Sequence, residues 1–348
     1  MKRNAEELEQ LAMEMLVAVK ADEANAAVVA KHLVSANLSG VDTHGVWQLP
    51  GYIAAIHAGE LVPAARPEIV RETSTSALVR GNWTFGQVVA KFAMEKAIAK
   101  AAKHDVSVVG LVESHHIGRL GEYAEAAAAE GMIAMVWGGG FGEKRPRVVP
   151  HGGRGAVLGT NPLAMGLPAG REPRMLFDFA TAASSGVKIV NAQRTGQEVP
   201  DGWIVDKEGN PTNNVDDLLE GGGQIPFGEH KGYALAVTAE WLGRVFTGSA
   251  QFAQANRGGL YFSHSGAAMM VFRADLFQPF ADYAKRADRL RKRIQAVPPA
   301  AGVEEVLIPG DPELQARAVR QQEGIPIPDM LWSELVDLAA SLGVSVPE

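Results

Sequence analysis

The sequence predicts an α/β fold that is preceded by a purely helical segment. Residues 106–112 and 132–137 are short apolar runs rich in strand-forming residues, the pattern of buried strands. The segments 85–103 and 121–130 have the length and composition of helices, so helices and strands alternate through this part of the chain. Such alternation is typical of α/β proteins, in which helices cover the faces of a sheet.

Two helices are predicted at the start of the chain. Asn4 can cap the first, in which apolar residues recur at helical spacing, and Asp22 begins a second helix that extends to about residue 36. Pro63, Pro67 and the polar run 73–76 then indicate a boundary. We therefore separate a helical part, residues 1–70, from the α/β region that follows.

Further elements are predicted beyond the alternating region. They are a glycine-rich tract at 138–159, a short strand at 175–177 that leads into Asp178, a hairpin turn at 204–211, a helix from Lys231 to Thr247 capped by Gly248, a basic helix at 281–296, a strand and helix start around 307–313, and a last helix at 329–342.

Composition limits the classes of partner. The chain has 348 residues, a formal net charge of -7 at pH 7 and no cysteine. The charge argues against nucleic acid as the main partner, and the lack of cysteine excludes disulfides and thiolate chemistry. No apolar run approaches the roughly 18 residues that cross a bilayer, and the glutamate-rich N-terminus does not resemble a signal peptide. We expect a cytoplasmic protein with no membrane partner.

Several common site motifs are absent. The run 153–159 imitates a dinucleotide fingerprint, but its spacing is one residue too long and Asn161-Pro162 follows where a helix should begin. We therefore reject a conventional Rossmann site. The chain also has no phosphate-binding loop of the Walker type, no His-Glu-x-x-His metal motif and no Gly-x-Ser-x-Gly hydrolase elbow.

The pair His115-His116 is the strongest candidate for chemistry. It lies where the predicted strand 106–112 gives way to a turn with glycines, a position at which α/β proteins often carry functional residues. An imidazole can give or take a proton near neutral pH, and Arg119 can hold an anion. The structural alternative is that one ring packs in the core while the other faces water.

Other loops carry residues with possible roles, each with a plain structural explanation as well. Asp42-Thr43-His44-Gly45 also has the composition of a turn. Asp178 stands between two phenylalanines, where a carboxylate is costly to bury unless it is hydrogen bonded. Lys231 lies at a predicted helix start, where its charge opposes the helix dipole unless it faces a bound anion.

Together these loops resemble one family, the malate/L-lactate dehydrogenase type 2 family, also called sulfolactate dehydrogenase-like. The matching pieces occur in family order along almost the whole chain: Asp42-Thr43-His44-Gly45, His115-His116-Ile117-Gly118-Arg119, Gly159-Thr160-Asn161-Pro162, Asp178-Phe179-Ala180-Thr181 and His230-Lys231-Gly232-Tyr233. The run 115–121 and the segment Leu307-Ile308-Pro309-Gly310-Asp311-Pro312-Glu313 look most similar to the family's hydroxycarboxylate dehydrogenase branch, which reduces 2-oxo acids with NADH or NADPH.

The resemblance implies a non-Rossmann nicotinamide-binding fold with a mixed sheet and a helical domain built from both chain ends. Residues 1–70 would then be joined by about 300–348, with 71–299 as the nicotinamide-binding domain. It also implies a homodimer, NAD or NADP as cofactor, and a small 2-oxo or 2-hydroxy acid as substrate. Implied cofactor contacts are His44, Gly118, Arg119, Leu120, Leu176, Phe177, Asp178, Phe179, Ala180, His230, Ser265, Gly310, Asp311, Pro312 and Glu313. Lys231 joins them from its place at a helix start.

For the chemistry we predict His116 as the proton donor, oriented by Asp178, with no metal. His44, Gln48 and Arg119 are predicted to bind the substrate. Gln48 departs from the family, many of whose members carry arginine there, so that Arg119 would have to supply the charge for a carboxylate. Two other functions stay open: a metal-dependent hydrolase using His44, His116, Asp178 and His230, or a nicotinamide-binding protein without turnover.

Overall fold

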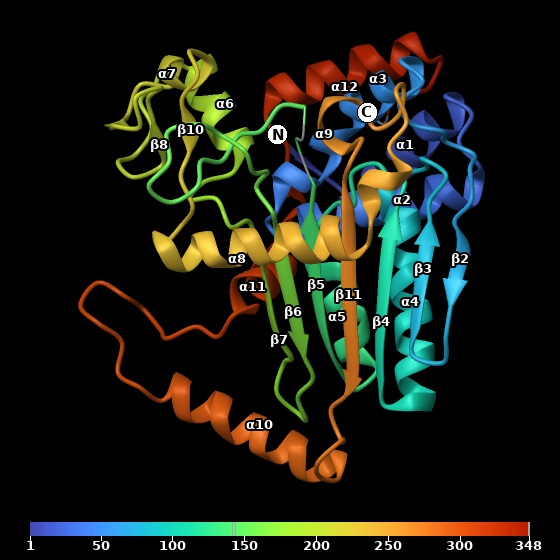
Figure 1. Ribbon diagram of the computed structural model, residues 1–348, viewed down its shortest axis with the longest axis vertical. Coiled ribbons are helices and arrows are strands. Elements are labelled where there is room, and N and C mark those ends of the chain that lie inside the picture. Colours follow the sequence, from blue (N-terminus) through green and yellow to red (C-terminus); the bar gives the residue numbers. More distant parts are fainter. Residues whose placement is uncertain (141, 143, 347–348) are drawn as a thin grey trace.

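A seven-stranded mixed sheet forms the centre of the computed structural model, which describes residues 1–140, 142 and 144–346 (Figure 1). Its strand order is β2-β3-β4-β11-β5-β6-β7. Within it β3 and β4 run parallel, and every other neighbouring pair is antiparallel. The strands are β2 (Glu68–Glu72), β3 (Ser76–Arg80), β4 (Val106–Val112), β5 (Met132–Gly139), β6 (Leu163–Leu167), β7 (Met175–Phe179) and β11 (Gly266–Arg273).

The order differs from a doubly wound sheet at its centre. β4 and β5 are joined through a helix, yet β11, which comes much later in the chain, lies between them and is antiparallel to both. Along β11 the residues from Ala267 to Phe272 pair on both edges, so this strand is central. The arrangement agrees with the rejection of a Rossmann site, which requires parallel neighbouring strands.

Helices cover both faces of the sheet. α4 (Gly86–His104) and α5 (Gly121–Ala129) pack on one face, and α8 (His230–Glu240) crosses the other (Figure 1). α4 turns a row of small residues, Ala90, Ala93, Ala97 and Ala101, to the core, which lets the helix approach the sheet closely. α8 continues as a π-helix, Trp241–Phe246, and the segment ends near Gly248, which has φ +71°.

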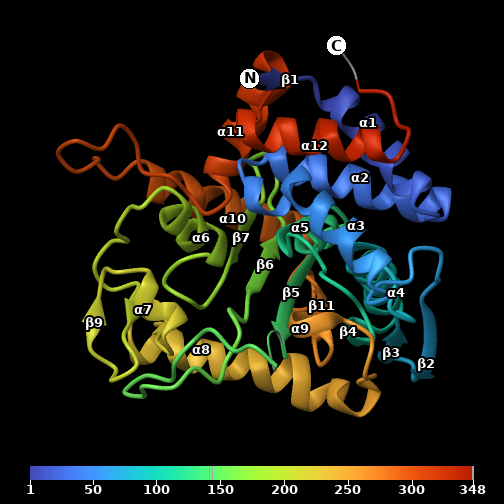
Figure 2. The same cartoon turned by 90° about the horizontal axis from the view of Figure 1, so that it is seen from above.

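The two ends of the chain share one helical layer above the sheet (Figure 2). Asn4 caps α1 (Ala5–Ala18) and Asp22 caps α2 (Glu23–Leu38), as the sequence predicted. α3 (Leu49–His57) and α12 (Asp329–Ser341) complete the layer, whose hydrophobic cluster combines Leu8, Leu33 and Ile53 with Ile325 and Leu335. β1 (Lys2–Arg3) also pairs with β12 (Ile325–Pro326).

The other elements surround this framework. A small sheet of order β10-β8-β9 contains the predicted hairpin. Its strands and the remaining helices are β8 (Ile204–Val205), β9 (Pro211–Thr212), β10 (Gly223–Gln224), α6 (Gly186–Arg194), α7 (Asp216–Leu219), α9 (Gly259–Phe262), α10 (Phe280–Gln295) and α11 (Asp311–Glu323), with short turns η1 (Asp42–His44), η2 (Val46–Gln48) and η4 (Ser249–Phe252).

Two expectations differ from the structure. The polar run 73–76 is the turn between β2 and β3, so the predicted boundary at residue 70 falls inside a strand of the large sheet. The segment before α11 was predicted as a strand but belongs to no strand of the structure. None of the described helices combines the length and apolar character needed to cross a bilayer.

Candidate active site

His116 lies just beyond the end of β4, in the segment that leads into α5. The N-terminus of α4 packs directly against this segment: a Cβ atom at Gly86 would lie 2.3 Å from the carbonyl oxygens of both His115 and His116. Gly118, with φ +70°, makes a similar approach, since a Cβ there would lie 2.2 Å from Nε2 of His32. Both glycines let the backbone that carries His116 sit tightly between two helices.

A hydrogen-bonded chain of side chains ends on His116. The Tyr52 hydroxyl lies 2.7 Å from Nδ1 of His116, and Nε2 of Gln87 donates to the same hydroxyl at 2.6 Å. Because the Gln87 amide donates to Tyr52, the Tyr52 proton is directed to Nδ1 of His116. In the neutral ring the other nitrogen, Nε2, then carries the hydrogen.

Aromatic rings enclose this histidine. His44, in η1, lies with its ring centre 5.4 Å from that of His116, and Phe262, in α9, lies at 5.5 Å. The Phe262 ring is closer still to His115, at 4.5 Å. The site is therefore assembled from η1, α3, α4, α9 and the segment after β4.

Burial keeps these histidines uncharged. It lowers the pKa of His116 well below the usual value of 6.5, and the neighbouring imidazoles of His44, His115 and His32 lower it further. Burial and, to a lesser degree, the Arg119 charge lower the pKa of His44 to about 4. A neutral imidazole near pH 7 suits a group that has to accept a proton and return it.

Asp178 does not orient His116, contrary to our expectation. Its Oδ2 accepts a hydrogen bond from the Gly121 backbone at 2.6 Å, and Tyr52 occupies Nδ1 of His116 instead. Burial raises the pKa of Asp178 to about 6, although the Gly121 N–H and the Arg119 charge act in the opposite direction. Asp178 thus fixes the start of α5, which carries the His116 segment.

Gln48 and Arg119 do not form the expected pair. Gln48 Nε2 donates to the Thr43 carbonyl at 2.7 Å. The Arg119 side chain is 1% exposed, with Nη1 3.9 Å from Glu125 Oε2, and the Arg119 backbone N–H donates to Nε2 of His32 at 2.9 Å. Arg119 lines a cavity that Gln48 does not reach, and the Gln48 amide is bonded to η1.

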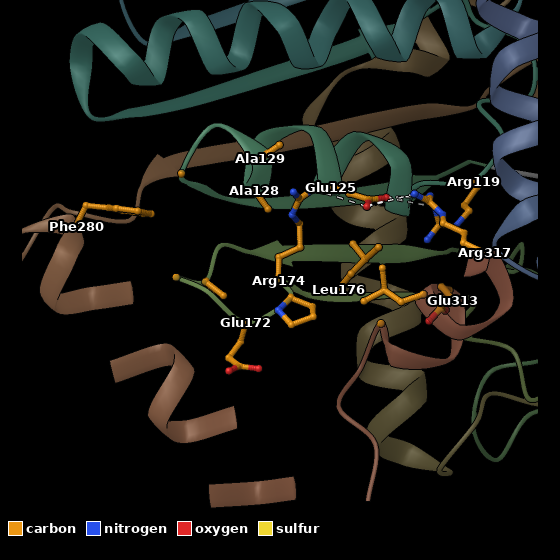
Figure 3. Close-up of a pocket in the computed structure, with 16 residues that line it drawn as sticks. Arg119, Glu125, Ala128, Ala129, Glu172, Arg174, Leu176, Phe280, Glu313 and Arg317 are labelled. Atoms are coloured by element: carbon orange, nitrogen blue, oxygen red, sulfur yellow. Dashed lines mark hydrogen bonds and ion pairs between the residues drawn. The ribbon is translucent and has the colours of Figure 1, made fainter. Parts of the chain in front are cut away.

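This cavity has a volume of about 400 Å³ and lies between α5, β7 and the start of α11 (Figure 3). Four of the predicted cofactor residues line it: Arg119, Leu176, Gly310 and Glu313. The backbone of Leu176 donates to the Pro309 carbonyl at 3.0 Å, which holds the edge strand against the α11 start. Neither His116, His44 nor Gln48 lines the cavity, so it is separate from the histidine cluster.

The remaining predicted residues are more dispersed. Phe179 stacks on Phe177 at 5.1 Å and meets Phe227 at 5.5 Å, which brings the segment before α8 to the end of β7. His230 begins α8 and lies 6.1 Å from the His151 ring, with Lys231 exposed beside it. Leu120 is buried. Ala180 and Pro312 follow β7 and begin α11.

Two of the predicted cofactor-binding side chains form hydrogen bonds within the protein. Ser265 is buried, and its hydroxyl donates to the Phe262 carbonyl at 2.9 Å. Asp311 is also buried and accepts from Arg291, from the Ile308 backbone at 2.9 Å and from Gln295 at 3.3 Å. Both side chains act here as internal anchors, and their predicted contact with a cofactor stays a prediction.

The metal-site alternative finds no support in the described part of the chain. No group of three or more His, Asp or Glu side chains there is arranged to hold an ion. Of the four ligands considered, His44 and His116 are neighbours, whereas Asp178 binds the Gly121 backbone and His230 lies beside His151.

The sequence did not reveal several site residues. Tyr52, Gln87, Phe262 and His32 contact the predicted segments but lie in stretches without an unusual pattern. Of these residues Tyr52 was the easiest to predict from the sequence. It follows Gln48 by four positions, and helical spacing places such residues on one face.

Comparison with known proteins identifies the family. A model of the malate/L-lactate dehydrogenase family matches residues 4–336. The malate/(S)-sulfolactate dehydrogenase of Methanothermus fervidus is 33% identical over 344 residues, which cover 98% of each chain. Hydroxycarboxylate dehydrogenase B of Escherichia coli K12 is 33% identical over 329 residues, covering 93% of this chain and 89% of the relative.

A solved structure gives the same result for the fold. The malate dehydrogenase of Entamoeba histolytica matches with a TM-score of 0.91 and 26% identity, over 100% of this chain and 99% of that chain. The mixed-sheet, non-Rossmann fold predicted from the resemblance is thereby confirmed, and it is a dehydrogenase fold. The chain belongs to the malate/L-lactate dehydrogenase family.

Proposed function

We propose that this protein is a nicotinamide-dependent 2-hydroxycarboxylate dehydrogenase that interconverts 2-oxo acids and 2-hydroxy acids. Its relatives carry the names of malate, lactate, sulfolactate and hydroxycarboxylate dehydrogenases. The single observation that carries the proposal within this chain is the Gln87–Tyr52–His116 chain, because it presents one histidine nitrogen for proton transfer while fixing the other.

The residues present fit a nicotinamide dinucleotide. Nε and Nη1 of the buried Arg119 have no hydrogen-bond partner among the described residues, which leaves donors available to a phosphate or ribose oxygen. Arg119, Leu176 and Glu313 at the cavity, and Lys231 at the helix start beyond β7, would hold the cofactor. When bound, it supplies or accepts the hydride at C2 of the substrate.

His116 moves the proton that accompanies the hydride. In reduction, the imidazolium donates from Nε2 to the oxygen that forms at C2, and Nδ1–H stays directed at the Tyr52 hydroxyl. In oxidation, the neutral ring with hydrogen on Nδ1 accepts the hydroxyl proton at Nε2. The group therefore has to alternate between one and two ring hydrogens.

Both of these ring states carry hydrogen on Nδ1, so the Tyr52 hydroxyl has to accept from Nδ1 in each of them. Tyr52 donates to Nδ1 when Gln87 Nε2 donates to Tyr52, as in the structure. The buried Gln87 Oε1 has no hydrogen-bond partner among the described residues. A half-turn of the amide brings this oxygen to the Tyr52 hydroxyl, which then donates to it and accepts from Nδ1–H.

Tyr52→Phe is expected to lower the reduction rate about tenfold, the usual worth of one buried hydrogen bond. Loss of the acceptor at Nδ1 disfavours the imidazolium and lowers the pKa of His116 further. The rate of reduction, which requires the charged ring, should therefore decline at a lower pH than in the wild type. Profiles of kcat against pH measure this shift. Tyr283→Phe is the matched control, since that hydroxyl donates to the distant Pro168 carbonyl; an unshifted Tyr52→Phe profile would exclude the relay.

Substrate recognition has to work without an arginine at position 48. Gln48 retains one amide hydrogen besides the one that it gives to Thr43, and His44 lies beside His116. We assign the substrate carboxylate to these two side chains, since Arg119 faces the cavity. A neutral amide binds a carboxylate more weakly than a bidentate guanidinium does.

Gln48→Arg is therefore expected to lower KM for small 2-oxo acids such as pyruvate by about tenfold, because a charge-assisted contact replaces a neutral one. Affinity for the reduced nicotinamide should stay unchanged. Steady-state kinetics and cofactor titration separate the two effects, with Gln48→Lys as a control that supplies charge without the planar fork. Equal or higher KM in Gln48→Arg would place the carboxylate elsewhere.

The function itself is tested by offering 2-oxo and imino acids with NADH and NADPH to the purified protein. We expect loss of the near-ultraviolet absorbance of the reduced nicotinamide with some member of the panel. A nicotinamide-binding protein without turnover would bind the cofactor and consume none, and a metal-dependent hydrolase would require an added ion. We further propose a homodimer located in the cytoplasm, in keeping with the resemblance and with the sequence.

A further inference from the structure

The helix α2 lies in the helical layer above the sheet (Figure 2), and it carries three buried polar side chains, Asn25, His32 and Asn37. Burying an amide or an imidazole costs free energy unless the group is hydrogen bonded, so each of them needs a partner. Asn25 donates to two carbonyls of the loop before β2. His32 and Asn37 instead bind the two segments that carry the site histidines, His116 and His44.

His32 holds the turn that follows His116. Its Nε2 accepts a hydrogen bond from the Arg119 backbone N–H at 2.9 Å, and a Cβ atom at Gly118 would lie 2.2 Å from the same nitrogen. Burial lowers the pKa of His32 to about 3, so Nε2 keeps the lone pair that this bond requires. The glycine and the neutral imidazole together fix the backbone just after His116.

Asn37 holds the turn that contains His44. Its Oδ1 accepts from the Val46 backbone N–H at 2.9 Å, and its Nδ2 donates to Asp42 Oδ1 at 2.7 Å. A Cβ atom at Gly45 would lie 2.1 Å from Asn37 Oδ1, so the turn packs directly on this amide. Because His44 lies between the two contacts, its position is set from α2.

The two turns meet beside α2. The ring centres of His44 and His116 lie 5.4 Å apart, and the His32 imidazole interacts electrostatically with both rings. Asn37 follows His32 by five positions in the same helix, which corresponds to about 7.5 Å along the helix axis. One short, rigid element therefore links the backbone of both histidines.

The proposed reaction requires such a fixed separation. The substrate carboxylate is assigned to His44 and Gln48, and the proton donor is His116. In every 2-oxo acid the carboxylate and the C2 oxygen are attached to adjacent carbon atoms, so their separation does not vary with the rest of the molecule. A misplacement of about 1 Å between reacting groups can lower a rate about 10²-fold.

We propose that His32 and Asn37 are positioning residues, which hold His116 and His44 at the separation that a 2-oxo acid requires. The inference rests on the proposed function. Each side chain acts through the turn that it binds, and neither is assigned a contact with substrate or cofactor. Their loss should therefore lower kcat by the same factor for small and large 2-oxo acids, whereas loss of a residue that contacts the variable part of the substrate would affect them unequally.

The first test reverses the hydrogen bond between Asn37 and Asp42. Asn37→Asp keeps an acceptor for the Val46 N–H but sets a second carboxylate against Asp42. We expect kcat to decline at least about tenfold, with pyruvate and with an aromatic 2-oxo acid alike. The double variant Asn37→Asp/Asp42→Asn again pairs one amide with one carboxylate at the wild-type net charge, and it should recover most of the lost rate.

The second test varies the reach of one amide. In His32→Gln the side-chain oxygen can replace Nε2 as the acceptor for the Arg119 N–H, whereas His32→Asn carries the same amide one methylene shorter. We expect kcat to be at least about tenfold lower in His32→Asn than in His32→Gln. Ser107→Ala is the matched control, because it removes one buried hydrogen bond at the opposite end of β4 and should leave kcat unchanged.

Titration with the reduced nicotinamide accompanies the kinetics. The number of cofactor sites per chain counts the folded protein, which separates a slower step from a lost fold; if His32→Asn does not fold, the Asn37 variants decide. A His32→Asn protein as fast as His32→Gln, a double variant no faster than Asn37→Asp, or losses that differ between the two substrates would overturn the inference. Turnover by the wild type leaves the proposed function intact in each case, whereas a wild type that reduces no 2-oxo acid refutes the function and the inference together.

Discussion

His116→Ala is expected to lower kcat by about 10²–10⁴, the usual contribution of a positioned acid or base, while affinity for the reduced nicotinamide stays near the wild-type value. His116 is the ring that the Gln87–Tyr52 chain reaches, and no other histidine has the Tyr52 hydroxyl on its Nδ1 in the structure described for residues 1–140, 142 and 144–346. Removing the imidazole ends the contact between the Tyr52 hydroxyl and Nδ1 and leaves the reacting oxygen without a proton source.

His115→Ala is the informative comparison. That ring is buried beside Phe262, and its Nδ1 has no hydrogen-bond partner within the described ranges. We expect His115→Ala to affect the free energy of unfolding more than it affects kcat. Steady-state kinetics and cofactor titration of both variants distinguish the roles: an inactive His115→Ala protein with an active His116→Ala protein would reverse the assignment.

Acid is expected to destabilise the fold steeply below pH 6.5. Burial lowers the pKa of His32 and of His115 to about 3 each, so both stay neutral in the folded protein where the unfolded chain already binds protons. Above pH 6.5 both states are neutral and stability is unaffected. Below it, each histidine lowers the free energy of unfolding by about 1.4 kcal/mol per pH unit.

Over two pH units the pair removes roughly 5 kcal/mol, which is comparable with the whole stability of many domains, about 5–15 kcal/mol. Urea unfolding at a series of pH values measures the slope. His44 and His116 also have lowered pKa values and add to the slope, so His32→Gln, whose side chain can still accept from the Arg119 backbone, should lower it by the share of one ring, about 1.4 kcal/mol per pH unit. His104→Gln, at an exposed position, should not change it. A stability that is constant between pH 6.5 and two units below would contradict the neutral, buried state of both rings.

The elements with strong local signals were predictable from sequence. Asn4 and Asp22 begin α1 and α2, and the strand at 106–112 has the predicted bounds, because caps and short β-rich runs act within a few residues. β11 was not predicted. Its residues 266–273 form a run of small and apolar side chains, and their place between β4 and β5 is fixed by long-range pairing that no local pattern encodes.

The residues of the candidate site likewise include some that a local sequence signal reveals and others that only long-range packing brings together. The segment with His116 was found because a histidine pair at the end of a strand is unusual, and the resemblance added His44 and β7. Tyr52 and Gln87 lie on α3 and α4, and only the packing of these helices brings them to Nδ1 of His116. Asp178 was predicted to orient His116 only because a carboxylate can support an imidazolium. In the structure its carboxylate accepts a hydrogen bond from the Gly121 backbone instead.

Direct transfer of hydrogen tests the central claim most plainly. A reduced nicotinamide with deuterium at the transferable C4 position is mixed with the enzyme and a reactive 2-oxo acid, and the product is examined by mass spectrometry. We expect a 2-hydroxy acid with deuterium at C2, formed in equal amount to the oxidised cofactor, and a rate lowered by about 10²–10⁴ in His116→Ala. Product without deuterium at C2, or no 2-hydroxy acid from any 2-oxo acid with either cofactor, would contradict it.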